Sequence, residues 1–226
     1  MNTQLMYTKN KNVVIFGLND LAELAHFYLT TDSEYNVVGF TVNESYKNID
    51  TFKSLPVVSF ENILTEYPPN EFYLFIPITG VKMNEVRKNL YLLGKKMGYN
   101  FISYISSKCT NLSESIGENC FILEDNTLQP FTKIGNNVIL WSGNHIGHHS
   151  VIEDHVFFTS HVVLSGHCKV KEKSWIGVNS TIRDGVTIGE STLIGMGSLI
   201  TKSTEDYGFY IGSPAKKQIN KSIEIL

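Results

Sequence analysis

The amino-acid sequence predicts an α/β N-terminal Rossmann-like domain followed by a left-handed parallel β-helix of hexapeptide repeats. Two observations lead to this fold class. An apolar residue stands at every sixth position from Ile116 to Ile200 without a gap, a period that matches neither an α-helix nor a β-strand. Before the repeats, short apolar runs alternate with segments of helical pattern. We therefore expect two domains, at residues 1–107 and 108–226.

The first domain shows the pattern of a parallel sheet. Runs rich in β-branched and aromatic residues predict strands at residues 12–16, 37–42, 56–58, 73–78 and 101–105. Segments of helical pattern separate them at residues 18–30, 60–66 and 82–97. Because buried strands that alternate with helices form parallel sheets with right-handed crossovers, we expect a sheet of four or five strands.

Ligands of such sheets bind beyond the carboxyl ends of the strands, where helix N-termini offer N–H groups to phosphate. The candidates for binding the nucleotide part of a substrate are Gly17, Asn19, Asn43, Asn84 and Arg87. Of the three spaced glycines in the dinucleotide fingerprint only Gly17 is present, and Asp20 would repel a phosphate, so NAD is disfavoured. Asn84 and Arg87 lie one turn apart on the predicted helix, where an ordinary salt-bridged surface is an equal alternative.

Each six-residue repeat is expected to form one short strand and one corner. The apolar side chain points inward, and a small or narrow residue four places later, such as Cys120 or Ser150, lets the chain turn. A glycine often follows the apolar residue directly, as at Gly147, and is expected to supply corner dihedral angles that a Cβ atom disfavours. Three repeats make one coil, so residues eighteen apart should stack at about 4.8 Å.

Composition and charge exclude several classes of function. The 226 residues carry a net charge of −3 with no block of Lys or Arg, which disfavours nucleic-acid binding. No stretch approaches the roughly 18 apolar residues of a membrane span, and residues 1–11 are too polar for a signal peptide, so a cytoplasmic location is the expectation. Cys120 and Cys168 occupy the small-residue position and are expected to pack inside, and no cysteine is a candidate nucleophile.

Six of the seven histidines lie between His145 and His167. Histidine takes up a proton near neutral pH, and acyl transfer from a thioester needs a base that deprotonates the acceptor as it attacks. His148, which follows a glycine at a corner, is the first candidate for this base, and His149 and His155 are the others. A series in the third place after the repeat residue should face outward, either for chemistry or for surface and intersubunit packing: His149, His155, His161 and His167.

The repeats, the Gly147–His148 pair, the preceding Rossmann-like domain and the Gly212–Lys216 segment together resemble the bacterial hexapeptide acyltransferases. More narrowly, the chain is similar to the branch that holds sialic acid O-acetyltransferases and the N-acetyltransferases of nucleotide-linked amino sugars. The resemblance implies a homotrimer with active sites between subunits. In it, His148 acts as general base and acetyl-CoA donates the acetyl group directly, without a covalent intermediate. The Rossmann-like domain would bind the nucleotide part of the sugar substrate.

The same resemblance implies sites for the co-substrate acetyl-CoA. The N–H of Gly166, eighteen residues after His148, would stabilise the oxyanion. The coenzyme would run along the later repeats toward the C-terminal segment. The candidate residues on this path are Gly177, Gly195, Gly197, Ser198, Pro214, Ala215 and Lys216.

Three positions depart from the family pattern. The residue after the base is commonly acidic in the family and is His149 here. A second family histidine nine places after the base corresponds to Phe157, so its role is missing or moved to His155, and a family Asn seven places before the base corresponds to Trp141. These departures indicate a subgroup with its own acceptor pocket. The candidate substrate-binding residues in this segment are Trp141, Asn144 and His145.

Residue types alone leave the acceptor open between an amine and a hydroxyl. An amine loses a proton more easily than a hydroxyl, so the altered surroundings of His148 favour an N-acetyltransferase, with O-acetylation of a sialic acid-type sugar as the alternative. A zinc-dependent β-helix hydratase would need two histidines five residues apart, a spacing that this chain lacks, so no metal is expected. A non-catalytic trimer is the remaining alternative, and the retained Gly–His pair disfavours it.

Overall fold

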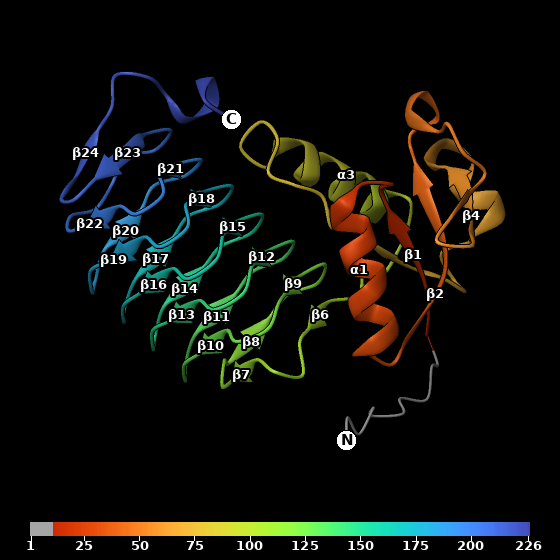
Figure 1. The fold of residues 1–226 in the computed structure, drawn as a ribbon, viewed down its shortest axis with the longest axis horizontal. Coiled ribbons are helices and arrows are strands. Elements are labelled where there is room, and N and C mark those ends of the chain that lie inside the picture. The colour runs from red at the N-terminus through yellow and green to blue at the C-terminus, as the bar shows by residue number, and fades with distance from the viewer. Residues whose placement is uncertain (1–10) are drawn as a thin grey trace. The chain divides into compact units, whose positions relative to one another are not determined.

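The computed structural model describes residues 11–226, which form two compact units (Figure 1). The first unit contains the described residues up to Thr79 together with Asn89–Tyr104. The second contains Gly80–Lys88 together with Ile105–Leu226, so it is built from two separate parts of the chain. The predicted division between residues 107 and 108 differs from this one because it places Gly80–Lys88 in the first domain.

The first unit is an α/β fold around a five-stranded sheet, as expected for a Rossmann-like domain. All neighbouring strands pair in parallel except β3 and β4. In the described part of the chain, every helix is too short or too polar to span a lipid bilayer. The strands, in the spatial order β3-β4-β2-β1-β5, are β1 (Lys11–Phe16), β2 (Tyr35–Val42), β3 (Thr51–Phe52), β4 (Leu55–Ser59) and β5 (Tyr73–Phe75). The helices are α1 (Asp20–Thr31), η1 (Glu44–Tyr46), η2 (Phe60–Asn62), α2 (Ile63–Glu66) and α3 (Glu85–Lys96).

The helix starts follow local backbone chemistry. Helix α1 begins where the Asn19 side chain accepts a hydrogen bond of 3.2 Å from the N–H of Ala22. The helix predicted from residue 82 begins only at Glu85, because residues 82–84 have positive φ angles that a right-handed helix does not allow.

Two predicted strands are shorter than expected. The strand predicted for residues 73–78 ends at Phe75, two residues before Pro77, which lacks the N–H that a strand ladder needs. The strand predicted for residues 101–105 is reduced to one bridge at Phe101 and to β6 (Tyr104–Ile105).

The second unit is a left-handed β-helix whose strands within the repeats are two residues long and end on the apolar repeat residue (Figure 1). They form three sheets of parallel strands, one on each face of the β-helix. The first face holds β7 (Thr110–Asn111), β10 (Thr127–Leu128), β13 (His145–Ile146), β16 (Val163–Leu164), β19 (Thr181–Ile182) and β22 (Leu199–Ile200). The second holds β8 (Ser115–Ile116), β11 (Lys133–Ile134), β14 (Val151–Ile152), β17 (Lys169–Val170) and β20 (Thr187–Ile188). The third holds β9 (Phe121–Ile122), β12 (Ile139–Leu140), β15 (Phe157–Phe158), β18 (Trp175–Ile176) and β21 (Leu193–Ile194), and continues into the hairpin of β23 (Phe209–Gly212) and β24 (Ala215–Lys217).

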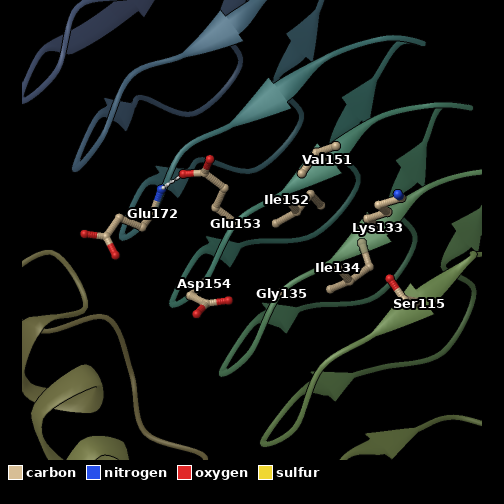
Figure 2. A pocket seen from close by; sticks show the side chains of 9 residues that line it. All are labelled: Ser115, Lys133, Ile134, Gly135, Val151, Ile152, Glu153, Asp154 and Glu172. Carbon is tan, nitrogen blue, oxygen red and sulfur yellow. Dashed lines mark hydrogen bonds between the residues drawn. The ribbon is translucent and has the colours of Figure 1, made fainter.

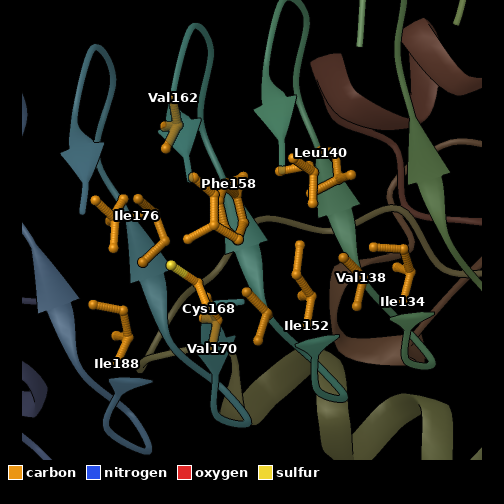
Figure 3. Close-up of a cluster of buried hydrophobic side chains, with 14 of the residues drawn as sticks. Ile134, Val138, Leu140, Ile152, Phe158, Val162, Cys168, Val170, Ile176 and Ile188 are labelled. Carbon is orange, nitrogen blue, oxygen red and sulfur yellow. The ribbon is translucent and has the colours of Figure 1, made fainter. Parts of the chain in front are cut away.

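Residues eighteen apart lie over one another, as the six-residue period predicts. His145, for example, pairs with Val163 in the next coil. The repeat residues fill the interior, where Leu140, Phe158 and Ile176 from three successive coils have no exposed surface (Figure 3). Each such side chain contributes about 1.5–3 kcal/mol by burial, which it gains only when its neighbouring coils are present. Cys120 and Cys168 also lie in this core, as expected.

The corners are made at a different position from the one predicted. The third residue after the repeat residue has a positive φ angle, as at Asn119 (55°) and Asn179 (59°). The glycines that directly follow the repeat residue, such as Gly117, do not adopt this conformation. A Cβ atom on Gly117 would lie 2.6 Å from the carbonyl oxygen of Gly135 in the next coil. The prediction that these glycines supply corner dihedral angles is therefore wrong, and they instead permit neighbouring coils to approach closely.

We predict that Gly117→Ala destabilises the β-helix, because the added Cβ meets backbone that moves only together with its coil. The expected loss in the free energy of unfolding is about 1–3 kcal/mol, measured by urea denaturation. Gly185→Asn is the control. Gly185 has a φ of 70° with nothing within 4 Å of its Cβ position, and Asn179 shows that asparagine fits such a corner. Equal losses in the two variants would contradict the steric explanation.

Candidate active site

Three histidines come together at one corner of the β-helix. His148 and His149 follow β13, and His167 follows β16 in the next coil. One ring nitrogen from each lies within 4.8 Å of the others, and all three side chains are exposed. The rings of His149 and His167 are stacked with their centroids 4.9 Å apart, which confirms the predicted stacking. The ring of His148 stands edge-on to both, with centroids 5.3 Å from His149 and 5.0 Å from His167.

Phe131 packs against this stack at a tilt of 36°, with its ring centroid 4.7 Å from that of His149. Phe131, His149 and His167 all have positive φ angles, so one repeated backbone conformation aligns their rings. The backbone of His148 is also fixed: its N–H donates to Gln129 Oε1 at 2.9 Å, and its carbonyl accepts from the His167 N–H at 2.9 Å. Sequence reasoning missed Phe131 and Gln129, although each lies about one coil before the histidine that it contacts.

The two ring nitrogens of His148 have different surroundings. Its Nδ1 lies 3.1 Å from Nδ1 of His149, so one of these two nitrogens carries a proton and donates it to the other. The opposite edge of the ring lies against Gly166, where a Cβ atom would be 2.7 Å from Cε1 and 2.8 Å from Nε2. The ring therefore presents Nε2 as the nitrogen that His149 does not engage. Gly166 lies beside His148 as expected, and its role as an oxyanion donor stays a prediction.

Imidazole is also a common ligand of transition metals, and the three nitrogens are close enough to share one ion. The spacing of histidines along the sequence therefore does not predict whether three of them come together, because coil stacking brings His167 to His148 and His149. In this structure the short contact between His148 and His149 is accounted for by their hydrogen bond. We therefore interpret the trio through proton transfer.

His155 lies at a different corner and is buried, with 4% of its surface exposed. Its Nδ1 is 2.9 Å from the Nδ2 of Asn137. Burial, followed by the charge of Arg87, lowers the pKa of His155 to about 4, so the ring is neutral at pH 7. The prediction that His155 faces outward is wrong, and nothing in this position suits it to catalysis. His161 and His167 are exposed as predicted.

Arg87 and Asn84 are fully buried against the β-helix, so the prediction that they bind a nucleotide is wrong. The Arg87 guanidinium donates to the carbonyl oxygens of Asn137 and His155, and to Asn84 Oδ1 at 2.9 Å. Asn84 Nδ2 in turn donates to the carbonyl oxygen of Lys173 at 2.9 Å. Burial lowers the pKa of Arg87 to about 9, so it stays charged at neutral pH. Both residues hold the Gly80–Lys88 segment on the second unit.

The remaining nucleotide-binding candidates lie together in the first unit. Gly17 follows β1 and Asn43 follows β2, its neighbour in the sheet. Gly17 has a φ of 116°, and its N–H donates to the Thr41 carbonyl at 2.8 Å. Asn19 is exposed at the start of α1. This is the carboxyl edge of the parallel strands, where such sheets bind ligands.

Of the three substrate-binding candidates Trp141, Asn144 and His145, two have side chains that a substrate could contact. Asn144 is buried, its Oδ1 accepting from the Val162 N–H at 2.8 Å and its Nδ2 donating to the carbonyl of Trp141. Because both ends of the amide serve the backbone, the expected contact of Asn144 with a substrate is wrong. Trp141 and His145 are half-buried, and His145 lies on the first face, between Val163 and the preceding coil.

The coenzyme candidates lie in the last coils and the C-terminal hairpin. Gly177 is buried, with a Cβ position 2.6 Å from the backbone nitrogen of Met196. The Ser198 hydroxyl is buried too and donates to the Gly195 carbonyl at 2.6 Å, so it is not available to a ligand. Gly197 is exposed with open space at its Cβ position. Also exposed or half-buried are Gly195, Pro214, Ala215 and Lys216.

A separate cavity of about 460 Å³ opens on the second face, along β8, β11 and β14 (Figure 2). Its charged side chains are already engaged. Glu153 accepts from the N–H of Glu172 at 3.1 Å and pairs with Lys169 at 2.7 Å, and Lys133 pairs with Glu114 at 3.1 Å. None of the candidate residues lines this cavity.

Comparison with known proteins identifies the class of repeat. Residues 115–148, 131–166 and 167–202 match the family model of the bacterial transferase hexapeptide (six repeats). Curated relatives include acyl-[acyl-carrier-protein]–UDP-N-acetylglucosamine O-acyltransferases from Sinorhizobium fredii, 27% identical over 106 residues, and Pseudomonas paraeruginosa, 32% identical over 85 residues. These matches cover 44% and 38% of this chain, and only 39% and 33% of the relatives. The resemblance to bacterial hexapeptide transferases is thereby confirmed.

Solved structures of the same fold cover both units. A variant of perosamine N-acetyltransferase from Caulobacter crescentus, in complex with CoA and GDP-perosamine, has a TM-score of 0.83 at 21% identity and covers 92% of this chain and 97% of that one. The acetyltransferase domain of PglB from Neisseria gonorrhoeae, in complex with acetyl coenzyme A, has a TM-score of 0.79 at 18% identity. WeeI from Acinetobacter baumannii has a TM-score of 0.78 at 22% identity. The last two matches cover 92% of this chain and 100% of the other. The predicted fold class is confirmed.

We predict that Gly166→Ala moves the His148 ring without unfolding the protein, because the added Cβ meets the far end of a side chain that can rotate. The histidine ring signals of His148, His149 and His167 in NMR spectra should shift, while that of His161 stays in place. The loss in the free energy of unfolding should be below about 1 kcal/mol. Unchanged signals from the three histidines would contradict the described packing.

We predict that His155 destabilises the protein in acid. Its pKa of about 4 in the folded protein lies below its ordinary value of 6.5, so the unfolded chain takes up the proton first as the pH falls. Stability is thus complete above about pH 6.5 and declines toward pH 4, by up to about 3 kcal/mol. Urea unfolding of the wild type and of His155→Asn at pH 7 and pH 4.5 measures the difference. A decline of equal size in both proteins would contradict this assignment.

Proposed function

We propose that this chain transfers an acetyl group from acetyl-CoA to the amino group of a nucleotide-linked sugar, with His148 as general base. The observation that carries the proposal is the exposed His148 imidazole, which is held by His149 at Nδ1 and by Gly166 at the opposite edge, with Nε2 left for an acceptor. Fold similarity to acetyltransferases solved with CoA and a nucleotide sugar supports it.

The reaction needs one proton to move from the acceptor to the leaving sulfur. As the amine nitrogen attacks the thioester carbonyl carbon, His148 Nε2 accepts an N–H proton. The tetrahedral intermediate then loses the sulfur as the C–S bond breaks, and the imidazolium returns the proton to it. The products are an acetamide and the free thiol of CoA. The hydrogen bond to His149 stabilises the imidazolium, because Nδ1–H of His148 can donate to Nδ1 of its neighbour.

We assign each of the two substrates to the remaining candidates of one unit. Gly17, Asn19 and Asn43 would bind the nucleotide at the carboxyl edge of the sheet. The coenzyme would lie along the last coils, past Gly197 and the hairpin at Pro214. We further propose a cytoplasmic homotrimer with sites between subunits, in which a second copy would cover the exposed histidine corner.

The test is a thiol-release assay with acetyl-CoA and a panel of GDP-, UDP- and dTDP-linked 3-amino and 4-amino sugars. We predict turnover on one of these sugars and a loss of at least about 100-fold in His148→Ala, because general-base catalysis contributes that much. His161→Ala is the matched control, since His161 is also an exposed corner histidine, and its rate should stay within twofold.

Other outcomes of this assay redirect the proposal. Turnover that survives in His148→Ala would move the base to His149. Transfer to a sugar hydroxyl, with no amino sugar consumed, would establish the O-acetyltransferase alternative.

A further inference from the structure

Gly166 carries no side chain in the column that contains His148, and it is buried with the His148 ring lying against it. Residues 148, 166 and 184 each stand in the second place after a repeat residue, eighteen apart, and so follow one another from coil to coil. A Cβ atom on Gly166 would lie 2.8 Å from His148 Nε2 and 3.1 Å from Asp184 Oδ1. An imidazole nitrogen and a carboxylate oxygen from the two flanking coils therefore both approach the position that a side chain at residue 166 would take.

The Asp184 carboxylate is not engaged elsewhere. It is exposed, and among residues 11–226 no ion pair or side-chain hydrogen bond holds it. The neighbouring column is open beside Asp184, because Gly185, which follows His167 in that column, has nothing within 4 Å of its Cβ position. A carboxylate without a partner beside an imidazole base suits a small cation that can give up a proton.

Resting on the proposed function, we propose that Asp184 binds the ammonium group of the acceptor next to His148 and thereby selects amines over hydroxyls. An amino sugar is positively charged in neutral water and a hydroxyl is not, so the carboxylate attracts only the amine. His148 Nε2 and Asp184 Oδ1 lie 2.8 Å and 3.1 Å from one point, the Cβ position of Gly166, so they are close enough to each other for one nitrogen to donate to both.

This arrangement accounts for both protons that the ammonium must lose. The first leaves R–NH₃⁺ for solvent, with the remaining N–H groups held by Asp184 and His148. The neutral amine then attacks the thioester carbon, and the second proton passes to His148 Nε2. It goes on to the sulfur as the C–S bond breaks, so the products are the acetamide, the CoA thiol and one proton in solution. The Asp184 carboxylate accepts a hydrogen bond from the N–H that remains in the product.

A matched pair of ligands tests the proposal. One is the nucleotide-linked amino sugar that the wild type acetylates, and the other is the same nucleotide sugar with a hydroxyl in place of the amine. Isothermal titration calorimetry in the presence of CoA measures both affinities. We expect Asp184→Asn to weaken amine binding at least tenfold, to raise the KM for the amine similarly, and to leave the hydroxyl ligand within twofold. Asp184→Glu should restore part of the amine affinity.

Asp125→Asn is the matched control, because Asp125 is an exposed corner aspartate in another column, and it should change neither affinity. Equal weakening of both ligands by Asp184→Asn, or unchanged amine binding, overturns the assignment of Asp184 while wild-type turnover keeps the proposed function standing. A wild-type protein that binds and acetylates no amino sugar instead contradicts the proposed function, and this inference with it.

Discussion

The ladder of backbone hydrogen bonds between coils is the constraint on which the second unit depends. Each strand donates to the coil that follows it, as where the Gly147 N–H meets the Leu164 carbonyl at 2.7 Å. A ladder of this kind holds the coils about 4.8 Å apart, which leaves no room for a side chain where two backbones meet face to face. Glycines such as Gly117 and Gly147 stand where the backbone of the next coil comes within 3 Å of their Cβ position, and side chains such as Phe158 are completely buried between coils.

The same ladder decides which polar side chains meet. Because every coil repeats the conformation of the previous one, a corner with positive φ recurs each six residues and each side chain there lies under its counterpart. His149 and His167 stack for this reason, and the tilted ring of Phe131 packs against His149. His148, one position earlier, meets the stack at its edge. The histidines look like a local cluster in the sequence, but the site is assembled by contacts between residues of successive coils.

Most of the β-helix could be predicted because its period of six is visible in one sequence, and the stacking of His149 on His167 follows from that period alone. The function of the glycines could not, since close backbone approach and unusual dihedral angles select the same residue. The position of Arg87 was also beyond prediction: a helix-like segment with one arginine carries no sign that its partners are carbonyls fifty and more residues later. Asp184 was missed because it approaches His148 only where the residue between them in the column, Gly166, has no side chain.

Arg87 also bears on how this protein can exchange parts in evolution. Its guanidinium and the Asn84 side chain serve carbonyls of Asn137, His155 and Lys173, so the β-helical unit includes nine residues encoded within the gene region of the other unit. Recombination between codons 104 and 105 would deliver a β-helix with buried carbonyls stripped of their donors, each costing about 1–3 kcal/mol. A transferable segment would have to start at Gly80 or earlier, and it would then include the whole of α3. The two parts of the chain would therefore have to be exchanged together.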